Sequence, residues 1–273
     1  MAGYVCTIAG GKGGVGKTTT AINIAAVLEE NGYETVVVDA DLGMANLGEM
    51  LQVEHDVSVH EILAGNSTVS EALTEAQGGM TVIPGEQSLE AFAEADPAKL
   101  RKVIKTLKNT FDVVLVDTGA GLSHETTVPL GLADGILLVT TPDDVAVNDT
   151  IKTADLADRV DGMVIGTLIT RVTRKTDVSD IDETFEMPLL GVIPVDLQAT
   201  DAEPMVLNSP DSTAADAYRE LTGALEPVFF DGASSEEVER VFDEEWFRED
   251  DDETEDEEET EEESSGVFGG LFS

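Results

Sequence analysis

The chain contains 273 residues with a hydrophobic fraction of 41%, and its 57 acidic residues against 15 basic ones give a formal net charge of −42. This length and apolar content suffice for one large α/β domain or two smaller ones. The acidic balance argues against nonspecific binding to nucleic acid, which needs a basic surface, and no apolar run is long enough to span a bilayer.

A single cysteine, Cys6, leaves one chain unable to build a disulfide framework or a cysteine-cluster metal site. Because Met1 leads directly into the first apolar run, we expect no cleavable leader and a cytoplasmic location. An acidic surface with so few lysines also suggests adaptation to a high-salt cytoplasm, where charge repulsion is strongly screened.

A glycine-rich stretch follows the first predicted strand, Tyr4 to Ala9, and opens into a helix whose apolar residues have helical spacing. Its residues fill the pattern G-x-x-x-x-G-K-[ST], in which backbone N–H groups and a helix start surround phosphate oxygens. In this pattern Lys17 reaches the outer phosphates and the Thr18 hydroxyl binds Mg²⁺. The predicted phosphate-binding residues are Gly11, Lys12, Gly13, Gly14, Val15, Gly16, Lys17, Thr18 and Thr19.

The same glycines also satisfy G-x-G-x-x-G, and Asp39 ends the next strand at the distance of a ribose-binding acid. A dinucleotide-dependent oxidoreductase is therefore an alternative, as is a glycine-rich turn without a ligand. The dinucleotide interpretation leaves Lys17 and Thr18 unexplained, and it accounts for neither Asp41 nor Asp117. We therefore favour the phosphate loop.

Two carboxylates, Asp39 and Asp41, follow the second predicted strand, Glu34 to Val38. At the carboxyl end of a strand beside a phosphate loop, they are placed to contact metal-bound water and attacking water. The alternative is an Asp-rich turn that caps the next element.

The middle of the chain predicts short helical pieces at Val59–Leu63 and Ser70–Ala76, a strand at Met80–Gly85, and a helix from Asp96 to about Lys108. That last helix is amphipathic and basic, so its polar face is either solvated or a surface for a partner or membrane. Its cations are Lys99, Arg101, Lys102, Lys105 and Lys108. The three histidines of the chain are assigned no chemistry.

An uninterrupted apolar run, Phe111 to Val116, ends in Asp117, as expected of a central parallel strand with an acid beside the metal. Three further strand and helix units follow. They are a strand at Gly135–Thr140 with a helix at Asp143–Arg159, a strand at Met163–Thr170 with a helix at Val178–Phe185, and a strand at Leu189–Ile193 before helices to about Leu225. This alternation predicts an α/β fold with a mostly parallel central sheet and helices on both faces, of the P-loop NTPase type.

The motifs predict a P-loop domain at residues 1–230, and the abrupt change in composition after it predicts an acidic disordered linker at 231–263 and a short apolar tip at 264–273. The linker holds 20 acidic residues against two arginines, so it repels itself and buries too little apolar area to fold alone.

The run Lys12–Thr19 resembles the deviant Walker A motif of the ParA/MinD ATPases, whose mark is the extra lysine, here Lys12. Asp39–Leu47 resembles switch I of the MinD branch, including its FlhG type. Gly191–Asp196 resembles the late strand and adenine-side loop of that branch. The resemblance extends over roughly residues 3 to 226.

The resemblance implies ATP and Mg²⁺ as ligands and an ATP-bound homodimer. Lys12 would then cross to the partner's phosphates, and Lys17 would bind its own. Thr18 and Asp117 would bind Mg²⁺, Asp39 would act on the metal's water shell, and Asp41 would position the attacking water. Asp149 lies where the family has an acid that can pair with the signature lysine. The residues expected around adenine are Arg171, Pro194, Val195 and Asp196.

The resemblance further implies a slow, partner-dependent ATPase that positions a cellular structure, such as the division site or motility or chemosensory machinery, at a membrane or pole. A ParA-like partitioning ATPase is an alternative, but nucleic acid is not an expected partner because the basic surface is largely absent. A scaffold with a decayed site is argued against by Lys12, Lys17, Asp41 and Asp117. The tip lacks the basic residues of a MinD membrane helix, so we expect an unknown protein partner and at most weak peripheral membrane contact.

Overall fold

The computed structural model describes residues 2–121, 123–197, 202–234 and 237. The chain divides into two units, Met1–Val241 and Phe242–Ser273, and every described residue belongs to the first. Most of the predicted acidic linker and the whole predicted tip therefore lie outside the described residues. The proposed boundary near residue 230 stays a prediction.

The described residues form one eight-stranded sheet in the order β3-β4-β2-β5-β1-β6-β7-β8. All neighbouring strands are parallel except β3, which is antiparallel to β4. The predicted mostly parallel sheet is confirmed. Its strands are β1 Tyr4–Ala9, β2 Thr35–Ala40, β3 Thr74–Glu75, β4 Thr81–Ile83, β5 Val113–Thr118, β6 Gly135–Thr140, β7 Val164–Val172 and β8 Leu189–Pro194.

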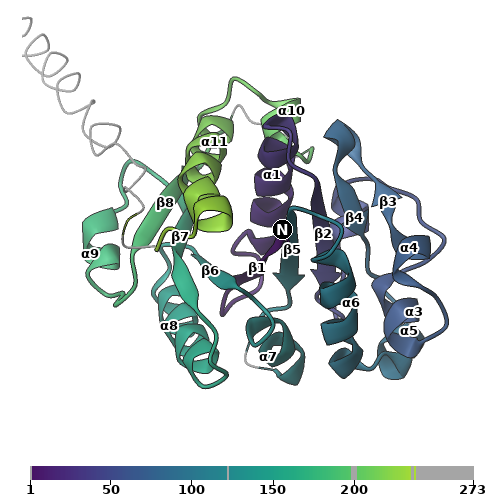
Figure 1. Ribbon diagram of the computed structural model, residues 1–273. Coiled ribbons are helices and arrows are strands. Elements are labelled where there is room, and N and C mark those ends of the chain that lie inside the picture. The colour runs from purple at the N-terminus through teal and green to yellow at the C-terminus, as the bar shows by residue number, and fades with distance from the viewer. Residues whose placement is uncertain (1, 122, 198–201, 235–236, 238–273) are drawn as a thin grey trace, which may run out of the picture. The chain divides into compact units, whose positions relative to one another are not determined.

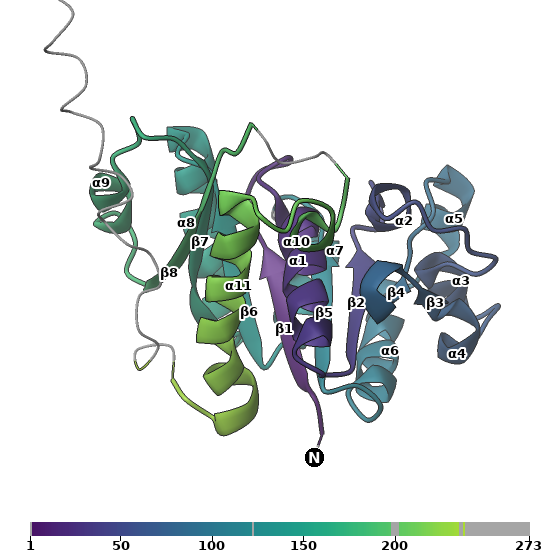
Figure 2. The same ribbon diagram turned by 90° about the horizontal axis from the view of Figure 1, so that it is seen from above.

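Helices cover both faces of this sheet (Figure 1). One face carries α1 (Lys17–Glu30), α10 (Met205–Asn208) and α11 (Thr213–Glu226), and Figure 2 shows α1 and α11 side by side. The other face carries α3 (Val59–Ala64), α6 (Leu100–Leu107), α7 (His124–Leu130) and α8 (Asp144–Asp158). The shorter helices are α2 Leu47–Met50, α4 Val69–Ala72, α5 Leu89–Glu94 and α9 Val178–Asp182, with further turns at Gln77–Gly79, Pro97–Lys99 and Pro227–Asp231.

The apolar strands supply both cores because alternate side chains of a strand point to opposite faces. In β5, Leu115 belongs to the core on the side of α1 and α11, whereas Val114 and Val116 belong to the core on the side of α3 and α6. Such strands, buried on both faces, are expected of a parallel sheet between two helix layers. None of the helices among the described residues is long and apolar enough to cross a membrane.

β1 lies between β5 and β6. The strands on one side of β1 are β2 to β5, and those on the other side are β6 to β8, so the direction in which the chain adds strands to the sheet changes at β1. In open α/β sheets a ligand binds at such a switch point, outside the carboxyl ends of the strands. Asp39 of β2 and Asp117 of β5 are direct neighbours in register at this edge. The sheet therefore brings both predicted acids to the end of β1, where the glycine-rich loop begins.

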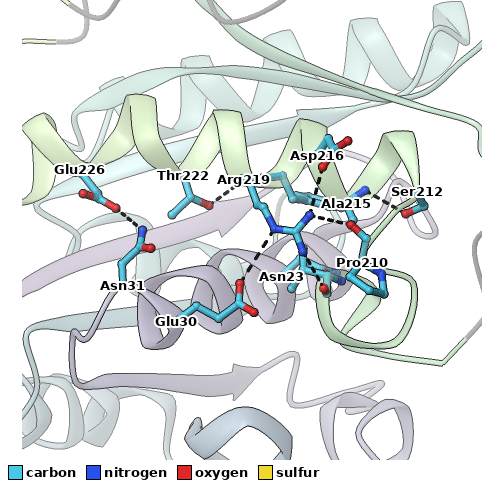
Figure 3. Close-up of polar contacts among 12 residues, drawn as sticks. Asn23, Glu30, Asn31, Pro210, Ser212, Ala215, Asp216, Arg219, Thr222 and Glu226 are labelled. Atoms are coloured by element: carbon cyan, nitrogen blue, oxygen red, sulfur yellow. Dashed lines mark hydrogen bonds and ion pairs between the residues drawn. The ribbon is translucent and has the colours of Figure 1, made fainter.

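One arginine links α11 to the elements around it (Figure 3). Arg219 donates to the backbone oxygens of Val206 (2.9 Å) and Pro210 (2.8 Å), and its guanidinium lies 4.0 Å from the carboxylate of Glu30 in α1. At the carboxyl end of α11, Asn31 donates to Glu226 at 2.6 Å. These contacts hold α10 and α11 against α1.

Several predicted boundaries are wrong. The expected helix Ser70–Ala76 ends at Ala72, because the chain then pairs with β4 as β3. The strand expected to end at Thr170 continues to Val172, where it pairs with Pro194 of β8. The helix expected over Val178–Phe185 ends at Asp182. Pairing between distant strands decides the first two of these ends, and a local pattern does not contain that information.

Candidate nucleotide site

The glycine-rich loop connects β1 to α1 and depends on glycine at specific positions. Gly14 and Gly16 have φ of 77° and 95°, and Gly16 is the residue before the first turn of α1. A β-carbon on Gly11 would overlap the backbone of Asp149 in α8, so only glycine fits between loop and helix. The first turn of α1 contains no acidic residue, so its backbone N–H groups are available to an anion.

Lys17 lies almost buried beneath this loop, with 7% of its surface exposed. Its Nζ donates to the backbone oxygen of Lys12 at 3.4 Å. Burial lowers the pKa of Lys17, while the charges of Asp117 and Asp41 oppose that shift. An ammonium group removed from water in this way is stabilised when an anion binds beside it.

Asp39 is fully buried and holds the segment that follows β2. Its carboxylate accepts hydrogen bonds from the backbone N–H groups of Asp41 (3.2 Å), Asn46 (3.1 Å) and Leu47 (3.1 Å). Burial raises the pKa of Asp39 to about 6, although these hydrogen bonds oppose the shift. Asp39 therefore fixes both ends of the segment predicted as switch I.

Asp117 is also fully buried, and the hydroxyl of Thr18 donates to its Oδ2 at 2.6 Å. Its other oxygen, Oδ1, is buried with no hydrogen-bond partner. Burial, together with the charge of Asp39, raises the pKa of Asp117 to about 8. A hydroxyl and a carboxylate with an unused oxygen form an oxygen donor set that suits Mg²⁺.

The carboxylate of Asp41 lies between the switch I segment and the loop after β5. Its Oδ1 accepts from the N–H of Met44 at 3.1 Å, and a β-carbon on Gly119 would come within 2.9 Å of the same oxygen. Only a glycine at position 119 allows this close approach. Asp41 thus faces the loop that follows Asp117.

Lys12 differs from Lys17 in exposure, because 44% of its side chain is accessible. Its Nζ forms an ion pair with Asp143 at 2.9 Å, and the bond to Lys12 lowers the pKa of Asp143. The pairing considered for Asp149 is not found: Asp149 instead bonds to Lys152 at 2.8 Å. Asp143 caps the start of α8 and faces the loop, whereas the backbone of Asp149 packs against Gly11.

A pocket of about 360 Å³ adjoins the loop on the side of β7 and β8. Of the residues predicted around adenine, Arg171, Pro194 and Asp196 line it, whereas Val195 does not and is 46% exposed. Asp196 also accepts from the N–H and hydroxyl of Thr213, at 2.8 and 2.9 Å. The full lining is Gly16, Thr19, Met50, Thr170, Arg171, Ile193, Pro194, Asp196, Glu203, Met205, Ala214 and Tyr218.

Two polar residues of this pocket were not anticipated from the sequence. The hydroxyl of Thr170 bonds to the backbone oxygen of Val15 in the loop at 2.6 Å. Glu203 accepts from Asn23 of α1 at 2.8 Å, and burial raises its pKa. A threonine within an apolar strand and an acid beside a proline carry no recognisable local signal, so only their long-range contacts identify them.

The loop, the two lysines and the three acids at one sheet edge define a P-loop nucleotide-binding protein. A family model described as an AAA domain matches residues 3–161. An uncharacterized ATP-binding protein of Methanocaldococcus jannaschii is 35% identical over 226 residues, which cover 80% of this chain and 86% of that protein.

Two solved structures share the fold. The septum site-determining protein MinD complexed with Mg-ADP from Pyrococcus horikoshii is 31% identical with a TM-score of 0.78, over 82% of this chain and 96% of that one. The MinC:MinD cell division protein complex of Aquifex aeolicus gives 26% identity and a TM-score of 0.73, over 81% and 95%. The chain belongs to the ParA/MinD family of P-loop ATPases, as its motifs predicted.

Proposed function

We propose that the chain is an ATP-dependent dimerising switch of the MinD type that positions a cellular structure at a membrane or pole. The observation that carries this proposal is the contrast between its two loop lysines. Lys17 is buried beneath the loop of its own chain, whereas Lys12 extends outward and is held only by an exposed ion pair. This contrast supports a role for Lys17 at the nucleotide of its own chain and a role for Lys12 at the nucleotide of a second copy.

In this proposal Lys17 neutralises the outer phosphates of ATP, and Thr18 and Asp117 hold Mg²⁺. When bound, the metal neutralises phosphate charge. No group of three or more His, Cys, Asp or Glu side chains among the described residues could hold a metal. A cation shared between one carboxylate, one hydroxyl, water and nucleotide phosphates needs no such cluster. Asp39 would orient the water around that cation.

Asp41 would position the attacking water. Its carboxylate lies between the switch I segment and the loop after β5, and it has accessible surface. Phosphoryl transfer asks a protein mainly to position groups and to stabilise charge. Loss of Asp41 should therefore lower turnover more than ATP binding.

Lys12 would link hydrolysis to assembly. The side chains of the Lys12–Asp143 pair are 44% and 53% exposed, and such surface pairs contribute about 0–1 kcal/mol. Because breaking the Lys12–Asp143 pair costs so little, a contact between Lys12 and the phosphates of a partner's ATP would be more favourable than the pair it replaces. Asp143, rather than Asp149, would hold the lysine in the monomer.

The base would bind in the pocket lined by Arg171, Pro194 and Asp196. Val195 would contribute at most its backbone oxygen, because its side chain does not line the pocket and its N–H donates to the oxygen of Val172 at 2.7 Å. A MinD relative has been solved in complex with MinC, which supports a protein partner for this chain. We place the protein in the cytoplasm, with weak peripheral membrane contact through residues 264–273.

The test compares Asp41→Ala and Lys12→Ala with the wild type in ATP binding, dimer formation by light scattering and phosphate release. We expect Asp41→Ala to bind ATP and accumulate as a dimer with little turnover, and Lys12→Ala to bind ATP but remain monomeric. Lys105→Ala, which removes an exposed lysine of α6, is the matched control and should behave as wild type. Normal dimerisation of Lys12→Ala, or normal turnover of Asp41→Ala, would contradict the proposal.

A further inference from the structure

His60 is fully buried in α3 and bonds to two backbone segments outside its own helix. Its Nε2 lies 2.9 Å from the oxygen of Leu42, and its Nδ1 lies 3.1 Å from the nitrogen of Glu86. A carbonyl oxygen can only accept, and a backbone N–H can only donate. The ring is therefore neutral with its proton on Nε2, and it connects two loops.

One of these loops carries the predicted catalytic acid. Leu42 directly follows Asp41, and its side chain is buried in the core beneath α3. Asp39 holds the end of the same segment through Asn46 and Leu47. Between Asp41 and Asn46 the N–H of Met44 closes an internal turn on Asp41. From outside the segment, the imidazole bonds to the backbone oxygen of Leu42.

The other loop is firmly anchored to α3 and to the sheet edge. The N–H of Val59 donates to the oxygen of Pro84 at 2.8 Å, and the Ser58 side chain caps α3. A β-carbon on Gly85 would lie 3.2 Å from the carboxylate of Asp39, so this turn packs closely against switch I. The Gln87 amide donates to the oxygen of Ala45 at 2.8 Å and provides a second contact.

We propose that His60 is a positioning residue for hydrolysis, which holds the backbone after Asp41 so that this carboxylate stays aimed at the loop after β5. The inference rests on the proposed function, in which Asp41 positions the attacking water. Both hydrogen bonds of the His60 ring go to backbone atoms of residues that are not proposed to hold nucleotide or metal, so His60 acts on the site only through the bond to Leu42. The bond to Glu86 fixes the ring, and Gln87 acts on the same segment.

Two substitutions separate the two bonds. In His60→Gln the side-chain nitrogen can occupy the position of Nε2 and donate to Leu42, whereas the acceptor for Glu86 is lost. In His60→Asn the oxygen can occupy the position of Nδ1 and accept from Glu86, whereas the donor to Leu42 is lost. We expect His60→Gln to retain kcat within about threefold, and His60→Asn to lower it about 10- to 100-fold with KM for ATP little changed.

If His60 had a purely structural role, the two variants would be impaired to the same extent, because each loses one of two buried hydrogen bonds. Equal losses of kcat in both variants, or a rise in KM instead of a fall in kcat, would overturn the inference. Hydrogen exchange of amides 41–47 in the nucleotide-free protein gives a readout that needs no ATPase activity. Exchange there should be faster in His60→Asn than in His60→Gln, with the amides of residues 11–19 unchanged as the internal control.

The ATPase assay and the exchange measurement together distinguish failure of the proposed function from failure of the role of His60. Absent ATPase activity in the wild type would contradict the proposed function, whereas equal exchange in the two variants would contradict the role of His60. Where His60→Asn does not fold, Gln87→Ala replaces it, because Gln87 is exposed and its loss leaves the core intact. Gln87→Ala should likewise accelerate exchange of amides 41–47. Unchanged exchange would contradict the idea that contacts from the turn after β4 hold the backbone of residues 41–47 in place.

Discussion

Substitution of Asp117 by asparagine should stabilise the nucleotide-free protein while it removes a proposed metal ligand. Asp117 is fully buried, its neighbour in register is the buried Asp39, and one of its oxygens has no hydrogen-bond partner. Asparagine has nearly the same shape and can accept the hydrogen bond from Thr18. It carries no charge, so the repulsion from Asp39 disappears.

The magnitude follows from the pKa of Asp117, which is raised from 3.8 to about 8. Between these two values the folded protein holds a proton that the unfolded chain has released. The free energy of unfolding of the wild type should therefore fall, relative to the variant, by up to about 1.4 kcal/mol per pH unit from pH 5 to 8. The unpaired amide of asparagine costs about 1–3 kcal/mol. Summed between pH 3.8 and 8 the difference is about 6 kcal/mol, so after this cost we expect a net gain at pH 8 of about 4 kcal/mol, or roughly 8–16 °C in Tm.

The assay is thermal and urea unfolding of both proteins between pH 5 and 8, with and without ATP and Mg²⁺. Asp155→Asn is the control, because it removes the same charge from an exposed position on α8. Ligand should raise the Tm of the wild type and leave that of Asp117→Asn nearly unchanged. A variant no more stable than wild type at pH 8, with a difference independent of pH, would refute the argument that ionised Asp117 destabilises the fold.

Three further predictions test the loop and the C-terminal segment. Lys17→Ala should lose ATP binding at least 100-fold in titration calorimetry, since outer phosphate charge is left uncompensated; near-normal affinity would contradict the phosphate-loop assignment. Gly11→Ala should lower Tm by several degrees through overlap with the Asp149 backbone, whereas Gly13→Ala, whose β-carbon meets nothing within 4 Å, should fold normally. Deletion of residues 264–273 should abolish localisation of a tagged protein without a change in ATPase rate, and unchanged localisation would rule out a docking role.

The sequence by itself determined the loop, the central strands and the placement of acids at strand ends. Glycine and lysine spacing is a local property, and a phosphate loop needs only neighbouring residues to form. The apolar runs before Asp39 and Asp117 likewise predicted buried parallel strands, and the carboxyl ends of such strands meet at one edge of the sheet. Family membership followed from the same local motifs.

Only the tertiary structure decided the contacts between segments distant in the chain. It placed Asp39 and Asp117 in register, paired Lys12 with Asp143 rather than Asp149, and brought His60 to the backbone oxygen of Leu42. It also excluded Val195 from the pocket that Thr170 and Glu203 help to form. Each of these depends on the packing of helices on the sheet and on strand order, because a side chain's partner is set by which elements pack together and not by its neighbours in sequence.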